Sequence, residues 1–257
     1  MVRLEIKIDS MMLRAPARIS VAMPQMVFDE GRNLKCLWCL HPAFSDGSIF
    51  IEKLGLSELA DEGWIVVCPS LSNGFYLNRH GTDTADFLDD ELYPYLGRLL
   101  QLPKERAMHV CLGISMGAFG ALNWGLRRGG YFSRLVLVSG YFDNRLPLDP
   151  RLRSQRSSYL LSKAVGPLVD DCFGKGSKPL ADADVGALLE AAKSSKAKLP
   201  KMEFLCGSGD LMSLAQMQAC YQMVVSKGFC ASFETVPGEH NAAAWRCCIE
   251  KALKESS

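Results

Sequence analysis

The sequence predicts an α/β fold in which a mostly parallel central sheet carries helices on both faces. Short, almost continuous apolar runs are typical of strands buried on both sides, and they occupy residues 34–40, 64–68, 108–114, 135–138 and 201–206. Most segments between these runs are long enough for a helix and have apolar residues at helical spacing. Strands that alternate with helices in this way form parallel sheets.

The first 24 residues instead predict an antiparallel hairpin. Residues 2–9 alternate apolar and charged side chains, as a strand with one buried face does, and residues 17–23 form the second strand. The connector is 10–16, and Pro24 ends the hairpin. The alternation in 2–9 differs from the continuous apolar run of an export signal, so the sequence predicts a cytoplasmic location.

Helices and loops connect the strands of the first half. Residues 48–62 predict a helix in two pieces, with Ser57 as the N-cap of the second piece. Residues 70–82 form a polar loop that contains glycine. A long helix is expected over 83–100, and Pro94 interrupts it.

Residues 141–199 break the alternation of strand and helix. They contain four prolines and many charges, with helical segments expected near 154–165 and 183–195 and with Pro167 interrupting any longer helix. We interpret this stretch as a small insertion over the top of the sheet, within a single domain that covers 1–257. The remaining elements are expected to be a helix at 212–227, a strand at 230–236 and a last helix at 242–255.

The composition excludes several classes of partner. Of 257 residues, 48% are hydrophobic and 22% charged, and the net charge is +1, so no nucleic-acid surface is expected. No apolar run approaches the ~20 residues that cross a bilayer, so no membrane partner is expected. The ten cysteines mostly lie in apolar stretches, and Cys36 and Cys39 should face opposite sides of one strand. The sequence predicts no metal site and no cofactor.

The pentapeptide Gly113-Ile114-Ser115-Met116-Gly117 has the pattern of a nucleophile elbow, a sharp turn between a strand and a helix. A buried strand precedes it and a helical pattern follows it, which is the context that this motif needs. In such a turn the serine occupies a strained backbone position with its hydroxyl exposed, and the glycines let strand and helix approach closely. Ser115 is therefore the candidate nucleophile.

A serine nucleophile needs a base that takes its proton, and the base needs an acid that orients it. His240 follows strand 230–236 and comes after Ser115 in chain order, as the base of an elbow serine does. Two other histidines have different expected roles. His109, at the entry of the elbow strand, should be structural, and His41 should hold its loop by a hydrogen bond.

Two aspartates compete for the role of the acid. Asp210 lies in a glycine-rich turn just beyond strand 201–206, whereas Asp143 follows the strand after the elbow. The turn can aim the Asp210 side chain at the base, which favours Asp210 and leaves Asp143 as the alternative. Glu239, next to His240, should point away from the imidazole into solvent.

The negative charge that forms during acyl transfer needs two fixed N–H donors, the oxyanion hole. The backbone N–H of Met116 is expected to supply one, and the loop at 41–47 the other. Pro42 has no N–H, so Ala43 is the first candidate in this loop and Phe44 the next. The substrate-binding residues are expected to be Phe44, Phe75, Tyr76 and His80.

Five segments together resemble the esterase D-like family of α/β-hydrolases. They are similar to its first hairpin, oxyanion segment, elbow, acid loop and histidine loop, and they lie at 10–24, 40–47, 113–122, 206–210 and 237–245. The family includes tributyrin esterases, S-formylglutathione hydrolases, feruloyl and acetyl xylan esterases, and the antigen 85 mycolyltransferases. The resemblance covers nearly the whole chain and is nearest to the short tributyrin esterases.

The resemblance implies an α/β-hydrolase fold and a triad of Ser115, Asp210 and His240. Two departures lie in the oxyanion segment, where Pro42 replaces the usual glycine and 44–46 reads Phe-Ser-Asp in place of Ser-Gly-Asn.

The expected activity is that of a serine carboxylesterase acting on a small-molecule ester through an acyl-enzyme intermediate. Thioester hydrolysis, as with S-formylglutathione, and acyl transfer are alternatives on the same residues, and a non-catalytic relative is a third. Bulky Phe44, Phe75 and Tyr76, with a charged insertion, predict a small pocket for acetyl to butyryl groups. Whether the chain forms a homo-oligomer stays open.

Overall fold

The computed structural model describes residues 1–25, 34–79, 81–143, 145–154, 156–174, 182–195 and 197–254, the side chains of 153–162 excepted. Within these ranges the main sheet has eight strands in the order β1-β2-β4-β3-β7-β8-β9-β10. Their bounds are β1 Val2–Ser10, β2 Ala15–Met23, β3 Lys35–Leu40, β4 Trp64–Ser70, β7 His109–Ile114, β8 Arg134–Val138, β9 Lys201–Gly207 and β10 Ala231–Val236. A separate pair consists of β5 Asn78–Arg79 and β6 Thr82–Asp83.

The strand directions confirm the predicted fold class. β1 and β2 form an antiparallel hairpin, and β2 is antiparallel to β4. From β4 through β10 all neighbours are parallel. The carboxyl ends of these parallel strands therefore lie at one edge of the sheet, and the loops that follow them meet there.

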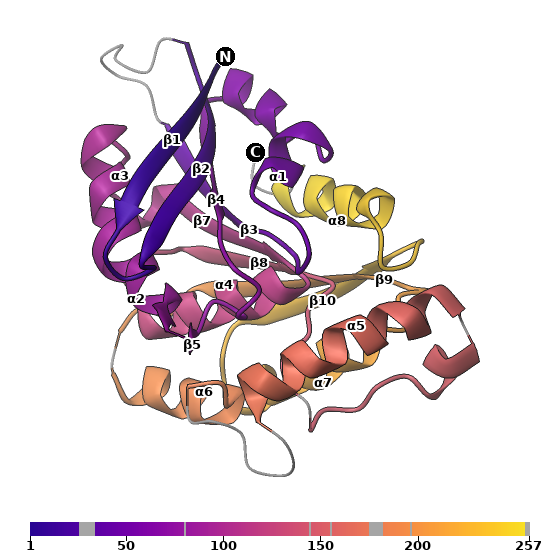
Figure 1. Ribbon diagram of the computed structural model, residues 1–257. Helices are drawn as coiled ribbons and strands as arrows, with labels where there is room; N and C mark the ends of the chain where they lie inside the picture. Colours follow the sequence, from indigo (N-terminus) through magenta and orange to yellow (C-terminus); the bar gives the residue numbers. More distant parts are fainter. Residues whose placement is uncertain are drawn as a thin grey trace.

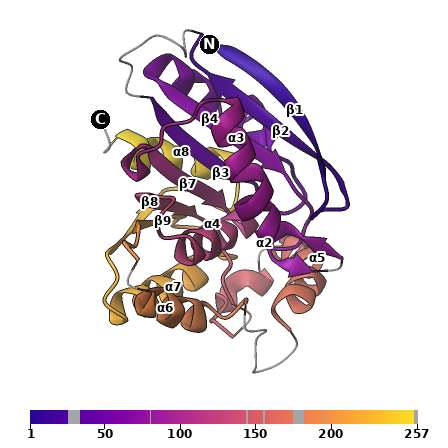
Figure 2. The same cartoon turned by 90° about the vertical axis from the view of Figure 1, so that its left-hand side faces the viewer.

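Helices cover both faces of this sheet (Figures 1 and 2). Their bounds are α1 Ser48–Glu52, α2 Thr84–Asp86, α3 Tyr93–Leu99, α4 Met116–Arg127, α5 Arg156–Phe173, α6 Val185–Ser194, α7 Leu214–Ser226 and α8 Ala242–Lys254. The apolar layer with α1 and α8 contains Cys39, and the layer with α3 to α7 contains Cys36. The two thiols thus face opposite sides of β3, as the strand period predicts.

The N-cap predicted at Ser57 is wrong. The 3-10 helix Leu56–Glu62 begins one residue earlier, after Gly55, whose φ of 74° places it in the left-handed region. Ser57 is buried inside this helix, and its hydroxyl accepts a hydrogen bond from Arg3 Nη2 (2.9 Å). The left-handed glycine makes the turn into the helix, so the serine hydroxyl is used in a tertiary contact instead.

Two prolines inside helical stretches have different effects. A π-helical segment, Phe87–Leu92, separates α2 from α3, so the predicted interruption near Pro94 is confirmed. By contrast, α5 continues through Pro167 as one helix of 18 residues, so the interruption predicted there is wrong. Pro167 is exposed, and the hydrogen bond that proline cannot donate is therefore lost on the solvent side, where water can replace it.

Candidate active site

The predicted elbow is a tight turn between β7 and α4. Ser115 has a φ of 53° and a ψ of −114°, and its N–H donates to the carbonyl of Val138 (2.9 Å) in the neighbouring strand. A Cβ on Gly113 would lie 1.9 Å from the carbonyl oxygen of Gly117. A Cβ on Gly117 would lie 1.9 Å from the carbonyl oxygen of Leu40. Only glycine fits at these two positions, and their backbones hold the serine at the end of the strand.

The structure places Ser115, His240 and Asp210 in one hydrogen-bonded chain. His240 Nε2 lies 3.2 Å from Ser115 Oγ, and His240 Nδ1 lies 2.9 Å from Asp210 Oδ2. Asp210 is fully buried, so its carboxylate needs a hydrogen-bond donor such as His240 Nδ1. An Nδ1–H that donates to Asp210 leaves Nε2 free to accept the serine proton, which is the arrangement that a general base requires.

Backbone contacts fix the loops that carry the acid and the base. Gly209 N–H donates to the Gly238 carbonyl (2.8 Å), and a Cβ on Gly207 would lie 2.5 Å from that same oxygen. The Asp210 Oδ1 atom accepts a further hydrogen bond from the Ser213 N–H (3.1 Å). Glu239 is exposed, as predicted. The loops after β9 and β10 are thus joined directly, which sets the distance between Asp210 and His240.

Asp143, the alternative acid, has another partner. Its side chain is 1% exposed and pairs with Arg145, whose Nε lies 2.9 and 3.0 Å from the two carboxylate oxygens. Its backbone N–H donates to Gln216 Oε1 (3.2 Å). In the described residues His240 contacts the carboxylate of Asp210 and not that of Asp143.

The other two histidines in the described residues are buried in hydrogen-bonded positions. His41 Nε2 accepts from the Leu71 N–H (3.0 Å), and its Nδ1 lies 2.8 Å from the Pro42 carbonyl. His109 Nδ1 accepts from the Trp38 indole N–H (3.1 Å). Burial lowers the pKa of both imidazoles below the ordinary histidine value. His41 holds its loop and His109 has a structural position, as the sequence predicted.

The two predicted oxyanion donors border the same cavity as Ser115. The cavity has a volume of about 160 Å³, and Met116 and Ala43 are among its lining residues. The N–H of Phe44 donates to Asn73 Oδ1 (2.9 Å), so this alternative donor is already used. No acceptor in the described part of the chain takes the N–H of Met116 or of Ala43. Both donors can therefore serve a ligand.

The residues expected to bind substrate occupy different positions. Phe44, 58% exposed, and Phe75, 1% exposed, both line the cavity. Tyr76 does not line it, because its side chain is buried beside Gly120 of α4 and its hydroxyl donates to the His41 carbonyl (2.9 Å). It holds the loop that begins at His41 and does not face the cavity. His80 lies outside the described residues.

Four of the seven non-glycine residues with positive φ in the described ranges lie in the cavity wall or next to it. Phe44, Phe75, Tyr76 and Ser115 all have positive φ values, of 58°, 50°, 58° and 53°. Non-glycine residues enter this region at an energetic cost, and they persist where the surrounding structure holds them. The two loops that form the cavity wall and the elbow itself are therefore held by their packing in conformations that the local sequence disfavours.

Sequence reasoning missed several residues of the cavity. Ser213 Oγ lies 3.3 Å from His240 Nδ1, and the Trp245 ring packs edge-on against the imidazole, with 5.2 Å between centroids. Tyr141 and Met212 complete much of the remaining wall. Ser213 and Met212 directly follow the turn that holds Asp210, and this proximity in the chain was the available signal.

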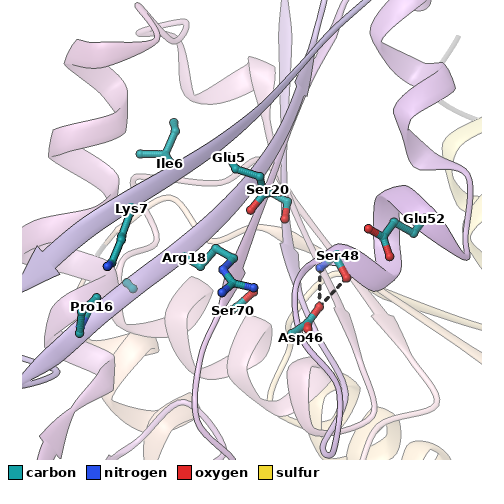
Figure 3. A pocket seen from close by; sticks show the side chains of 11 residues that line it. Glu5, Ile6, Lys7, Pro16, Arg18, Ser20, Asp46, Ser48, Glu52 and Ser70 are labelled. Atoms are coloured by element: carbon teal, nitrogen blue, oxygen red, sulfur yellow. Dashed lines mark hydrogen bonds between the residues drawn. The ribbon is translucent and has the colours of Figure 1, made fainter.

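A larger hollow of about 570 Å³ lies elsewhere, between the β1–β2 hairpin and α1 (Figure 3). Residues of both positive and negative charge line it, including Lys7, Arg18 and Glu52, and none of the candidate catalytic residues does. Volume alone therefore does not locate the candidate active site. Within the described ranges no group of three or more metal-ligating side chains occurs, and no helix is long and apolar enough to cross a membrane.

The sheet order and the serine elbow are those of the α/β-hydrolase fold. A family model described as "Putative esterase" matches residues 12–255, so the chain belongs to this esterase family. A curated relative is an acetyl esterase of Caldicellulosiruptor saccharolyticus, 24% identical over 230 residues that cover 88% of this chain and 84% of the relative. The protein is a serine carboxylic ester hydrolase, and the family resemblance seen in the sequence is confirmed.

Solved structures with the same fold include two proteins of Staphylococcus aureus. The fluorophosphonate-binding serine hydrolase FphF aligns with a TM-score of 0.79 at 22% identity, covering 98% of this chain and 97% of the other. The S-formylglutathione hydrolase FrmB aligns with a TM-score of 0.76 at 22% identity and the same coverage. Mycobacterium tuberculosis MPT51 has the same fold, with a TM-score of 0.70 at 14% identity over 99% of this chain and 97% of the other.

Proposed function

We propose that this enzyme hydrolyses short-chain acyl esters, with Ser115 as the nucleophile, His240 as the general base and Asp210 as the acid that orients it. The observation that carries the proposal is the hydrogen-bonded chain from Ser115 Oγ through both imidazole nitrogens to a buried carboxylate. Membership of an esterase family supports the same reaction class.

The proposed reaction has two halves. As Ser115 Oγ bonds to the ester carbonyl carbon, its proton passes to His240 Nε2, and the N–H groups of Met116 and Ala43 stabilise the oxyanion. When the carbonyl re-forms, the carbon–oxygen bond to the alcohol breaks and His240 donates its proton to that alcohol. A water molecule then attacks the acyl-enzyme with His240 again as base, which releases the carboxylic acid and restores Ser115.

The size of the cavity supports a short acyl group. Phe44 and Phe75 narrow a space of about 160 Å³ beside Ser115. Each methylene that fits an apolar pocket contributes about 0.8 kcal/mol, so the rate should rise with chain length only until the pocket is full. We therefore expect the highest kcat/KM on acetyl to butyryl esters and lower values on longer ones.

The test uses p-nitrophenyl esters from acetate to decanoate, with S-formylglutathione measured in parallel. A kcat/KM that peaks by butyrate supports the proposal, whereas one that rises through decanoate contradicts the small pocket. A much higher kcat/KM on S-formylglutathione than on every ester would favour the thioesterase alternative. A serine-directed phosphonate should label the peptide that contains Ser115, and the Ser115→Ala variant should remain unlabelled.

A further inference from the structure

A second cavity adjoins the one that contains Ser115. It has a volume of about 240 Å³ and shares three lining residues with the catalytic cavity: Tyr141, Val165 and Met212. These three side chains are therefore the boundary between the two spaces. Met212 belongs to the turn after β9, and Val165 belongs to α5, so the helix of the 141–199 stretch forms one wall of both cavities.

The second cavity is mainly apolar. Besides the shared residues, Leu148, Leu152 and Val169 line it. Leu152 and Val169 are buried, whereas Leu148 is 45% exposed and lies where the cavity can be reached from solvent. Among the described lining residues Asp170 is the one with a charge, and its carboxylate would disfavour a negatively charged occupant. The lining suits an uncharged apolar group of moderate size.

The position of Met212 relates this cavity to one end of the substrate. In the proposed reaction His240 Nε2 donates a proton to the leaving alcohol, so the alcohol portion of the ester lies beside His240. Met212 directly precedes Ser213, whose Oγ lies 3.3 Å from His240 Nδ1. The oxyanion loop with Ala43 and Phe44 lines the catalytic cavity only. The second cavity is thus bordered by the turn that contacts the base and not by the loop with Ala43 and Phe44, which favours the leaving-group end of the substrate.

We propose that the second cavity binds an apolar alcohol portion of the ester, while the acyl group occupies the space beside Phe44 and Phe75. This inference rests on the proposed function. Met212 is an unbranched side chain with several rotatable bonds, so it can turn aside to admit such a group. The preferred substrates are then short-chain esters of uncharged aromatic or branched aliphatic alcohols, as opposed to esters of small or anionic alcohols.

Gly166 of α5 offers a direct test, because it lines the second cavity and does not line the catalytic cavity. A Cβ at Gly166 would meet no atom within 4 Å, so Gly166→Leu can fill the space without a clash at its base. Gly97 of α3 is a matched control. It also lies in a helix, a Cβ there would also meet nothing within 4 Å, and it lines neither cavity.

The experiment compares kcat/KM for ethyl acetate and 2-phenylethyl acetate, and follows the binding of 2-phenylethanol by NMR titration. For the unmodified enzyme we expect the phenylethyl ester to be preferred at least tenfold. Gly166→Leu should lower kcat/KM at least tenfold for this ester, keep that for ethyl acetate within twofold, and weaken the binding of 2-phenylethanol. Gly97→Leu should change none of these values.

Three results would overturn the inference. The first is an equal change in kcat/KM for both acetates in Gly166→Leu, and the second is no change for either. The third is a selective loss of kcat/KM for ethyl octanoate, measured in parallel, which would assign the cavity to a long acyl chain. Failure of the proposed function looks different, because the unmodified enzyme would then hydrolyse no ester. In that case, 2-phenylethanol binding that is weakened by Gly166→Leu would still support an apolar alcohol site. If the unmodified enzyme did not bind 2-phenylethanol, the alcohol site would be rejected.

Discussion

The Tyr76 hydroxyl donates a hydrogen bond to the His41 carbonyl oxygen (2.9 Å), two residues before the proposed oxyanion donor Ala43. Tyr76 is 2% exposed and lies against α4, the helix that begins at the elbow. This contact therefore fixes the loop with Ala43 to α4. The first N–H of α4, that of Met116, is the other proposed oxyanion donor. One buried phenol thus connects the two halves of the proposed oxyanion hole.

Removing this hydroxyl should impair catalysis more than substrate binding. Tyr76→Phe leaves the buried His41 carbonyl without its donor, which destabilises by about 1–3 kcal/mol. We expect kcat to fall by roughly tenfold while KM for p-nitrophenyl acetate stays within twofold, as expected for an interaction used in the transition state. Steady-state kinetics check this, with Tyr95→Phe, at an exposed tyrosine, as the control. A change in KM alone would place Tyr76 in substrate binding instead.

Ser115→Ala should lower ester hydrolysis by roughly 10³-fold or more, with residual activity from the oxyanion donors. The fold should be retained, because within the described residues the hydrogen bond of the Ser115 side chain is to His240 alone. Kinetics with p-nitrophenyl acetate and a thermal melt followed by circular dichroism measure the two effects. Activity within a factor of two of the unmodified enzyme would reject the proposed nucleophile.

Replacing Asp210 should mainly affect activity, whereas replacing Asp143 should mainly affect stability. Asp210→Asn disfavours the required imidazole tautomer, so kcat/KM should fall on the order of 10³-fold or more. Asp143→Asn removes the charge that Arg145 pairs with and should lower the melting temperature with a smaller effect on activity. Kinetics and melting curves of both variants check this. The reverse pattern would make Asp143 the acid.

Stability should decrease as the pH falls below about 6.5, the ordinary histidine pKa. Burial lowers the pKa of His41 and His109, so between 6.5 and these lower values the unfolded chain binds protons that the folded protein does not. The two histidines therefore make their full contribution to the free energy of unfolding above pH 6.5, and this contribution is lost as the pH falls. Urea unfolding between pH 7.5 and 5.0 measures it. His109→Gln should reduce the pH dependence, and an unchanged slope in that variant would exclude His109 as a source.

The elbow should not tolerate a side chain at Gly117. A Cβ there would lie 1.9 Å from the Leu40 carbonyl oxygen, a backbone atom that cannot move without displacing β3. We expect Gly117→Ala to cost at least about 3 kcal/mol in the free energy of unfolding, or to prevent soluble expression. Gly130→Ala is the control, since a Cβ at that position would meet nothing within 4 Å. Equal stability of the two variants would contradict the close approach.

The features that the sequence predicts well depend on short-range patterns. The strands at 34–40 and 108–114 are recognisable because burial on both faces leaves continuous apolar runs. The chain order of serine, aspartate and histidine then places three side chains at one sheet edge, because parallel strands end together.

The direction of loop side chains is not predictable in this way. Phe75 and Tyr76 are adjacent and both have positive φ, yet one lines the cavity and the other packs beneath α4. Their conformations depend on neighbours distant in the sequence, such as Gly120, which leaves room for the Tyr76 ring. The effect of Pro167 also depends on context, since an exposed helix face tolerates the lost hydrogen bond.

β10 is one of the two edge strands of the main sheet, and most of its residues are only partly buried. His240 lies in the loop after this strand, whereas Ser115 directly follows the fully buried β7. Local opening begins where few contacts hold the backbone, so this edge should separate before the centre of the sheet. The enzyme would then lose its proposed base while most of its secondary structure persists, and heating should abolish turnover before it abolishes the circular dichroism of the sheet.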